Sequence, residues 1–176
     1  MTRSLLRWQK VSRSKKSSGY VLFSYFVPGE FVNLFEIYLQ TVDLGENEIS
    51  DKGIEILGEA LRTHVRLHML FLDSNAITAR GSEGLSECLK NKQDLRVFNI
   101  DNNNIGPEGA IKLATQLTTN YGLSKLYCDS NGIGEEGAEA IAECMEMMDS
   151  LKKICLENNA IKDRGVIALA RALEEN

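Results

Sequence analysis

Asparagine recurs at a regular spacing in this sequence. Five asparagines follow one another at a constant spacing, at Asn47, Asn75, Asn103, Asn131 and Asn159. A carboxamide offers two N–H donors and a carbonyl acceptor, so it can bind a ligand or satisfy backbone groups where a chain turns. Each one lies in the pattern apolar-x-x-Asn-x-Ile. Where the chain leaves a strand, its amide and carbonyl groups have no hydrogen-bond partners in the sheet. We therefore expect a structural ladder and not a binding site.

Residue types that act in catalysis or bind metals form no recognisable group. The two histidines, His64 and His68, have no cysteines or further histidines at the short spacing of a zinc site. The sequence also lacks a phosphate-binding glycine loop and a Gly-x-Ser-x-Gly motif. We expect His64 to be a solvated loop residue. We expect that the chain is not an enzyme and that it uses neither a cofactor nor a metal ion.

The four cysteines are expected to be free thiols. Cys88 and Cys144 occupy the same helix position two units apart, and packed helices lie about 8–10 Å apart. A disulfide needs Cα atoms within about 7 Å, so this pair is too distant. Cys128 and Cys155 fall on neighbouring strands at positions of opposite parity, so they point to opposite faces. Free thiols favour a reducing compartment, and we expect a cytoplasmic protein.

Each unit between one ladder asparagine and the next predicts a short strand, a loop and a helix. Apolar residues at alternate positions, as in Leu70-x-Leu72, indicate a strand with one buried face. Ser50 and Thr78 are suitable N-caps, and Pro107 suits the first turn of another helix. A glycine recurs at 53, 81, 109, 137 and 165, which predicts close approach to a neighbouring turn. A fixed period of this length is typical of a solenoid.

The pattern resembles the ribonuclease-inhibitor-like subfamily of leucine-rich repeat proteins over residues 39–173. Its single repeat length and few cysteines are closest in style to the repeat arrays of NOD-like receptors. The resemblance implies an α/β horseshoe of five repeats, with parallel strands on the concave face and helices on the convex face. Strands stack about 4.8 Å apart whereas packed helices need about 8–10 Å, so such an array bends toward its strands.

The register also predicts which side chains face away from the helices. The first column holds Thr41, Met69, Val97, Lys125 and Lys153. The second holds Asp43, Phe71, Asn99, Tyr127 and Cys155. The third holds Gly45, Asp73, Asp101, Asp129 and Glu157. Acidic side chains in the third column either accept hydrogen bonds from loop amides or form a stripe that binds a basic partner.

Aromatic residues on a rigid concave sheet resemble the hot spots of protein interfaces. Phe71 and Tyr127 are the two aromatic residues of the columns. We expect the partner-binding residues to be Phe71, Asp73, Asn99, Asp101, Tyr127, Asp129 and Glu157.

Charge divides the chain into two parts. Residues 1–38 carry six basic and two acidic side chains, a net charge of +4. Because the whole chain has a net charge of −5, residues 39–176 carry −9. An acidic body disfavours nucleic acid and favours a protein partner with a basic or mixed-polarity surface. We expect residues 39–176 to form the repeat domain.

Residues 1–38 do not follow the repeat, and two interpretations remain open for them. They are expected to be a basic tail and a cap, with Phe31–Leu39 covering the first repeat. A transit peptide is the other interpretation. The apolar run Tyr20–Val27 is too short to span a membrane, so no membrane association is expected. The last helix has the apolar pattern of an internal one, which suggests an excerpt of a longer array.

The expected function is that of a non-enzymatic interaction scaffold, which binds a protein partner on its concave face. Two alternatives follow from the resemblance. One is a GTPase-activating regulator similar to Ran GTPase-activating protein, for which Arg80 and Arg164 are the arginines to test. The other is a ligand-sensing fragment of a NOD-like immune receptor. The sequence leaves the oligomeric state open.

Overall fold

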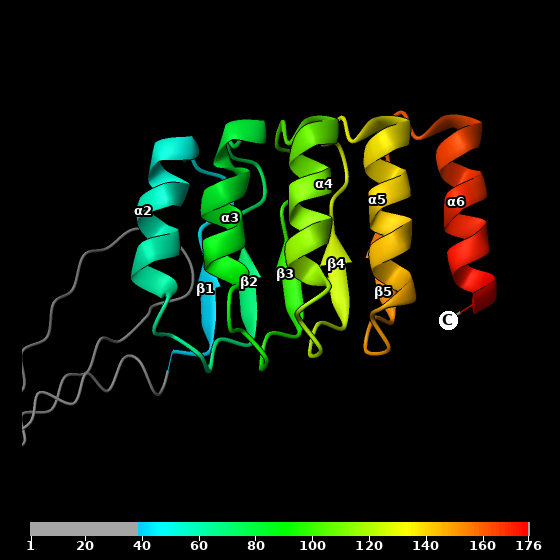
Figure 1. Ribbon diagram of the computed structural model, residues 1–176. Helices are drawn as coiled ribbons and strands as arrows, with labels where there is room; N and C mark the ends of the chain where they lie inside the picture. The colour runs from blue at the N-terminus through cyan, green and yellow to red at the C-terminus, as the bar shows by residue number, and fades with distance from the viewer. Residues whose placement is uncertain (1–38, 176) are drawn as a thin grey trace, which may run out of the picture.

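Repeating strand–loop–helix units stand side by side in a single row, as the computed structural model of the chain shows (Figure 1). The structure describes residues 39–175, so the expected tail and cap at 1–38 lie outside the described residues. The strands are β1 (Thr41–Asp43), β2 (Met69–Phe71), β3 (Val97–Asn99), β4 (Lys125–Tyr127) and β5 (Lys153–Cys155). The helices are α2 (Asp51–Leu61), α3 (Ser82–Leu89), α4 (Gly106–Leu117), α5 (Gly134–Glu146) and α6 (Lys162–Glu175). A 3₁₀ turn, η1 (Ala79–Gly81), precedes α3.

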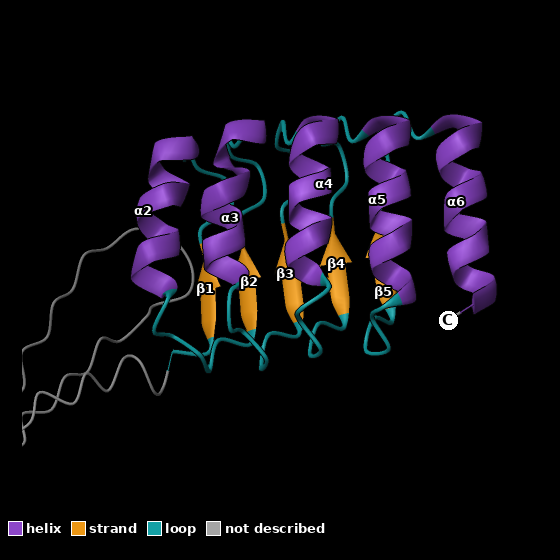
Figure 2. Cartoon of the chain, viewed as in Figure 1, coloured by secondary structure: helices purple, strands orange, loops and turns teal. Residues whose placement is uncertain are grey.

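The strands form one parallel sheet whose spatial order equals the chain order. All the described α-helices lie on the same face of that sheet (Figure 2). Every strand pairs with the next at a shift of one repeat; Thr41 lies opposite Met69, and Lys125 opposite Lys153. The α/β repeat solenoid expected from the asparagine spacing is therefore confirmed, with five units in the predicted register.

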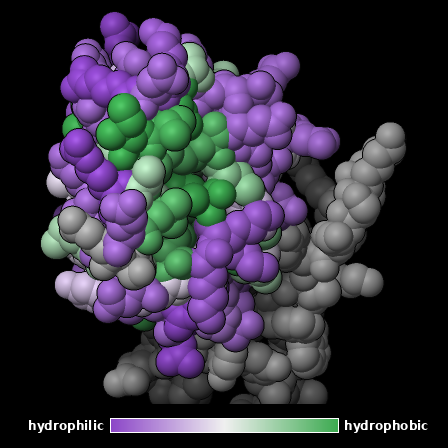
Figure 3. All heavy atoms as spheres, turned by 90° about the vertical axis from the view of Figure 1, so that its right-hand side faces the viewer, coloured by the Kyte–Doolittle hydropathy of each residue, from purple (hydrophilic) through white to green (hydrophobic). Residues whose placement is uncertain are grey.

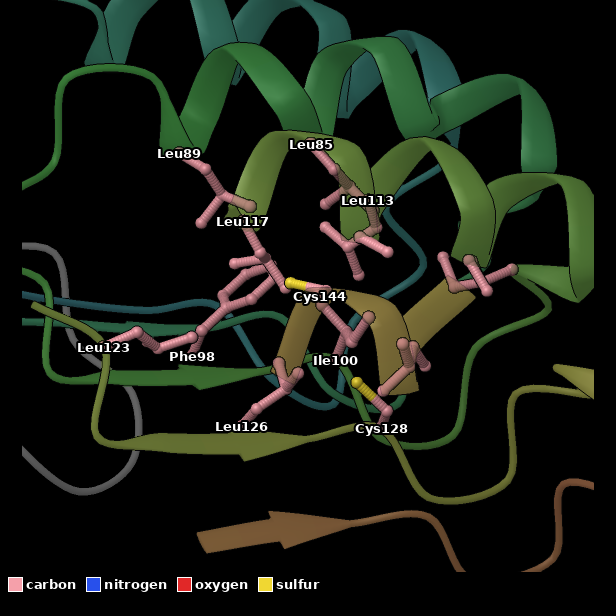
Figure 4. Close-up of a cluster of buried hydrophobic side chains, with 14 of the residues drawn as sticks. Leu85, Leu89, Phe98, Ile100, Leu113, Leu117, Leu123, Leu126, Cys128 and Cys144 are labelled. Atoms are coloured by element: carbon pink, nitrogen blue, oxygen red, sulfur yellow. The ribbon is translucent and has the colours of Figure 1, made fainter. Parts of the chain in front are cut away.

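The core lies between the sheet and the helices and continues through the row. Figure 4 shows side chains from the strands, such as Phe98 and Leu126, directed toward Leu113, Leu117 and Cys144 of the helices. These side chains are all buried. Because each unit packs only on its neighbours, the array has no single central core.

All four cysteines are free, as predicted, and three of them are buried. Burial raises the pKa of the Cys88 thiol to about 12 and that of Cys144 to about 11. Thiols with pKa values this high are protonated at neutral pH and react slowly. Cys88 and Cys144 therefore act as small apolar residues of the helix packing.

The recurring helix glycines lie where neighbouring units touch. A Cβ atom added to Gly109 would come within 2.6 Å of Ile105 Cγ2 and 2.8 Å of Ser82 Oγ in the preceding unit. At Gly137 the corresponding contact in the preceding unit is Ala110 Cβ, at 2.9 Å. The glycines thus permit the close approach that the sequence predicted, at the start of successive helices.

The loops that enter the helices change conformation along the row. In the first two units they form isolated bridges, Ser50 with Ala76 and Thr78 with Asn104. In later units the equivalent residues have positive φ, 65° at Gly106 and 68° at Gly134. The N-cap prediction was only half right: Thr78 Oγ1 accepts a hydrogen bond from Arg80 N, whereas Ser50 makes no side-chain cap bond.

None of the helices in the described range combines the length and the hydrophobicity that crossing a membrane requires.

Candidate functional site

The ladder asparagines fasten each unit to the one before it. Asn103 Nδ2 lies 3.0 Å from the carbonyl oxygen of Leu72 in the preceding unit, to which it donates. Its Oδ1 accepts a hydrogen bond of 3.1 Å from the amide of Ile77, also in the preceding unit. Asn75 makes the equivalent pair of bonds to Leu44 and Ile49. These carboxamides are occupied by backbone groups, which leaves them little capacity for a ligand.

Asn131 and Asn47 depart from this pattern. Asn131 Nδ2 donates to the Ile100 carbonyl at 2.9 Å, but its buried Oδ1 has no partner within the described residues. There the backbone turns at Gly106, whose amide donates to the Asn131 main-chain carbonyl instead. Asn47 is exposed, and its Nδ2 bonds carbonyls of its own unit, Leu44 and Gly45.

The acidic column also joins successive units. Asp101 Oδ1 accepts a hydrogen bond of 2.6 Å from the amide of Asp129, and Asp129 Oδ1 accepts one of the same length from Glu157. Asp73 Oδ1 accepts instead from the side chain of Asn99, at 3.0 Å. One oxygen of each of these carboxylates therefore stabilises the array, as in the first of the two interpretations.

Burial raises the pKa of the Asp101 carboxyl, and the carboxylates of Asp129 and Asp73 raise it further. The hydrogen bond from the Asp129 amide opposes this shift but does not reverse it. Asp101 therefore carries a charge that its surroundings disfavour, in the middle of the column.

The outward surface of the strands, which we call the sheet face, changes character along the row. Its members are Met69, Phe71, Val97, Asn99, Lys125, Tyr127, Lys153 and Cys155. The β2 and β3 end is apolar, with Met69 exposed and Phe71 and Val97 half-buried. The β4 and β5 end is cationic, because Lys125 and Lys153 are both exposed.

Tyr127 and Lys153 form a pair within the sheet face. The Lys153 Nζ lies 4.6 Å from the centre of the Tyr127 ring and 3.4 Å from its hydroxyl oxygen. Sequence reasoning placed Lys125 and Lys153 in the first column but left them out of the expected site. Two lysines at the same position of consecutive units were the signal that pointed to them.

Of the predicted site residues, Phe71, Asn99 and Tyr127 are brought together in one column across β2, β3 and β4. The acids follow the strand ends beside them, and Asp73 and Asn99 are in direct contact. The arrangement gives an extended strip with apolar, cationic and acidic parts. Such a strip can bind a surface over several units.

Of the other residues considered from the sequence, Arg164 and His64 make contacts away from the sheet face, and Arg80 forms no ion pair within residues 39–175. Arg164 forms two bonds to the Glu139 carboxylate, of 2.6 and 2.7 Å, whereas Arg80 is exposed and has no carboxylate partner among residues 39–175. His64 is half-buried, and its Nδ1 lies 3.1 Å from the Ala60 carbonyl oxygen, so it is less solvated than expected. Histidine, cysteine and acidic residues form no group suited to a metal ion in the described range.

Lys92 is a buried residue that sequence reasoning missed. Its side chain is 0% exposed, and Nζ donates to the carbonyl oxygens of Leu61 at 2.8 Å and Lys90 at 3.2 Å. Burial lowers the pKa of this amine. Lys92 therefore caps the C-terminal end of α2 from the neighbouring unit, where a cation is favourable. The polar residues at the same position of adjacent units, His64 and Asn120, were the available signal.

Comparisons with known proteins agree with this architecture. The family profile described as "Leucine Rich repeat" matches residues 37–58, 91–114, 129–142 and 150–170. The tropomodulin C-terminal domain of Caenorhabditis elegans superposes with a TM-score of 0.65 at 20% identity, over 78% of this chain and 84% of that one. Leiomodin-1 actin-binding site 2 superposes with a TM-score of 0.61 at 18% identity, over 77% and 81%. No curated protein sequence matches the chain.

Proposed function

We propose that this chain, which belongs to the leucine-rich repeat proteins, is a non-enzymatic scaffold that binds a protein partner on its sheet face. The observation that carries the proposal is the set of side chains on that face. Met69, Lys125 and Lys153 are exposed there on strands that the core holds rigid. A backbone that is already ordered loses little conformational entropy on binding, which favours affinity.

The chemistry of the sheet face favours a partner of mixed polarity. An apolar group of the partner would cover Met69 and Phe71, and an acidic group would approach Lys125 and Lys153. Basic groups would approach the acidic column, where each carboxylate keeps one oxygen beyond the bonds within the array. Such complementary charges contribute to specificity and to the association rate.

Actin is the first partner to assay, because one structural neighbour is named as the actin-binding site 2 of leiomodin-1. The shared architecture supplies the reason for choosing this partner. The sheet face, with Tyr127 and Lys153 as its best-defined pair, supplies the residues to change.

Binding to actin can be measured by cosedimentation with filaments and by fluorescence anisotropy with monomers. We expect the substitutions Y127A and K153E together to weaken binding at least tenfold, because they remove the aromatic contact and reverse a charge. The matched control is I111A with K112E, on exposed residues of α4. Circular dichroism checks that both variants fold.

Equal binding by both double variants would place the contact elsewhere than the sheet face. If actin does not bind the wild type, the same variants can be used against proteins captured from the cells that express the chain.

A further inference from the structure

The hydrophilic surface of the molecule is not uniform in charge. Figure 3 views the row from the side of α6 and shows a hydrophobic area with hydrophilic residues around it. Residues 39–176 carry a net charge of −9. Cations nevertheless gather where the chain enters the later strands, because Arg96 and Lys152 lie directly before β3 and β5. Lys125 and Lys153 follow as the first residues of β4 and β5.

The loops before β3, β4 and β5 surround a groove of about 570 Å³, which we call the loop groove. Its lining comes from three successive units and includes Arg96, Tyr121, Gly122, Ser124, Ser150 and Lys152. Sites for small ligands have volumes of about 300–1,000 Å³. Because the lining is mostly polar, the loop groove suits a charged ligand and not an apolar one.

Small residues open the loop groove. Arg66 and Asp94 occupy one position of two successive units, and their side chains pair at 3.3 Å. The next two units have Gly122 and Ser150 at this position. The guanidinium of Arg96 lies over Gly122, where a Cβ atom would overlap Nη1. The glycine thus admits the arginine to the wall of the groove.

The main chain fixes the Arg96 guanidinium by one of its nitrogens. Nη1 donates to the carbonyl oxygens of Gln93 at 2.8 Å and Gly122 at 3.1 Å. Nε and Nη2 have no acceptor within residues 39–175, and no carboxylate pairs with Arg96 there. These two nitrogens form the side-on pair that binds an oxyanion through parallel hydrogen bonds. The same pair of Arg164 binds the Glu139 carboxylate in this molecule.

Lys152 and Ser124 supply further donors. Lys152 is exposed and Ser124 is half-buried, and neither side chain has a hydrogen-bond partner in the described range. Arg96, Ser124 and Lys152 hold the same position of successive units, whose main chains are joined by hydrogen bonds. Neighbouring strands lie about 4.8 Å apart, so about 10 Å separate the backbones of the outer two. Both long side chains can therefore reach an anion that lies over Ser124.

The acidic residues near the loop groove do not neutralise it. The Asp94 carboxylate pairs with Arg66. Asp149 is exposed and is not part of the lining. The acidic column follows the last residues of the strands, whereas the loop groove lies before their first residues.

The donors of the loop groove fit a phosphate monoester better than a carboxylate. A phosphate monoester offers three acceptor oxygens and a charge of about −1.5 to −2 at neutral pH. Tyr121 also lines the groove, and it is 74% exposed. Its ring can pack against another aromatic ring. Nucleic acids and anionic membranes are extended polyanions, so they would also meet the acidic remainder of the molecule.

We propose that the loop groove binds a phosphotyrosine side chain of a partner protein. Arg96 and Lys152 bind the phosphate oxygens, and the Ser124 hydroxyl donates to one of them. Tyr121 packs against the phosphorylated ring. The loop groove shares no residue with the sheet face, so this proposal does not depend on the proposed function.

NMR titration of the ¹⁵N-labelled full chain with an alanine-rich peptide that carries one phosphotyrosine tests the proposal. We expect saturable shifts of the amide resonances of Gly122, Ser124 and Lys152, and none with the unphosphorylated peptide. K152E should weaken binding at least tenfold, because it places a negative charge beside the phosphate. Lys152 is exposed, so folding should be retained. K112E, on an exposed lysine of α4, makes the same charge change and should bind like the wild type.

Two further variants test the other contacts. R96K keeps the charge but not the side-on pair of nitrogens, and we expect binding to weaken several-fold. Y121A should weaken binding of the phosphotyrosine peptide and leave that of a matched phosphoserine peptide unchanged.

The absence of saturable shifts at the loop groove would overturn the proposal, as would equal binding by K152E and K112E. Tighter binding of a single-stranded oligonucleotide or of phosphoinositide vesicles, lost in K152E, would also overturn it, since the ligand would then be a polyanion.

Discussion

At the scale of single residues, the asparagine ladder is tested by removing one internal carboxamide. N103A leaves the Leu72 carbonyl without its cross-unit donor and the Ile77 amide without an acceptor. Unsatisfied buried groups of this kind cost about 1–3 kcal/mol, so the free energy of unfolding should fall by that amount. Urea denaturation measures it.

N47A is the matched control for this substitution, because Asn47 is exposed and bonds only its own unit. The effect of N47A on the free energy of unfolding should be clearly smaller. Equal losses for the two variants would show that the contacts between units contribute little.

Ala160 adopts a conformation that suits glycine. Its φ is 52°, whereas the equivalent residue of the preceding unit is Gly132, with a φ of 65°. A residue with a side chain is disfavoured in this region by about 1–2 kcal/mol, a cost that glycine avoids. Part of this gain is offset, because the unfolded state of glycine is more flexible and loses more conformational entropy on folding. A160G should therefore raise the free energy of unfolding by about 0.5–1 kcal/mol. A168G, within α6, should lower it by about 1 kcal/mol. Destabilisation by A160G would contradict the assigned loop conformation.

Asp101 predicts a pH dependence whose sign follows from its raised pKa. A carboxyl whose pKa is higher in the folded state contributes stability at low pH, which is lost as pH rises through the folded-state pKa. D101N removes this titration but keeps an oxygen that can accept from the Asp129 amide. The variant should be more stable than the wild type at neutral pH.

The advantage of D101N should shrink as pH falls through the folded-state pKa of Asp101, and it should be smallest below the unfolded-state value of about 4. Thermal melts at a series of pH values measure the difference. A constant difference between wild type and variant, or an advantage only in acid, would be inconsistent with repulsion within the acidic column. D149N, on an exposed loop residue, serves as the control.

At the scale of elements, the helix glycines should be intolerant of alanine. A glycine within a helix ordinarily costs about 1 kcal/mol relative to alanine, so G109A would stabilise an isolated helix. In the array its Cβ would meet Ile105, Ser82 and the backbone of Ala79. Crowding of this kind costs about 1–3 kcal/mol, and the net effect should be a loss of stability.

G53A provides the comparison, because a Cβ at Gly53 would meet only the Ile49 side chain of its own unit. Chemical denaturation of both variants should show the larger loss for G109A. A gain in stability for G109A would mean that α4 and its preceding neighbour can separate without cost.

Much of the architecture could be predicted because it rests on a repeated pattern. Apolar residues such as Leu70 and Leu72, together with the ladder, determine the strand register, and a shift would expose the core. The change of loop conformation near Gly106 could not be predicted, since it depends on contacts between units. The burial of Lys92 could not be predicted either, because its hydrogen-bond acceptors are main-chain carbonyls, which every residue supplies.

The sequence predicted where the residues of the candidate site lie better than it predicted what each of them does. Counting from each ladder asparagine located the columns, including Phe71 and Tyr127. It could not show that Asp101 and Asp129 already accept amide hydrogen bonds from the next unit. For that reason the lysines, whose amines remain exposed, are better positions for testing partner binding than the acids.

At the scale of the whole molecule, the row of units presents one extended side surface. The strands stand side by side in chain order, so the sheet face crosses several units. A partner that lies along this face can contact side chains of more than one unit, such as Tyr127 on β4 and Lys153 on β5.

Photo-crosslinking tests most directly whether the sheet face is the binding surface. A photoreactive amino acid is placed at Met69 on the sheet face or at Ile111 on α4, both exposed apolar positions, in the cells that express the chain. We predict a discrete crosslinked protein from position 69 that disappears when Y127A and K153E are also present, and none from position 111. Crosslinks from position 111 alone, or a product from position 69 that survives both substitutions, would contradict binding at the sheet face.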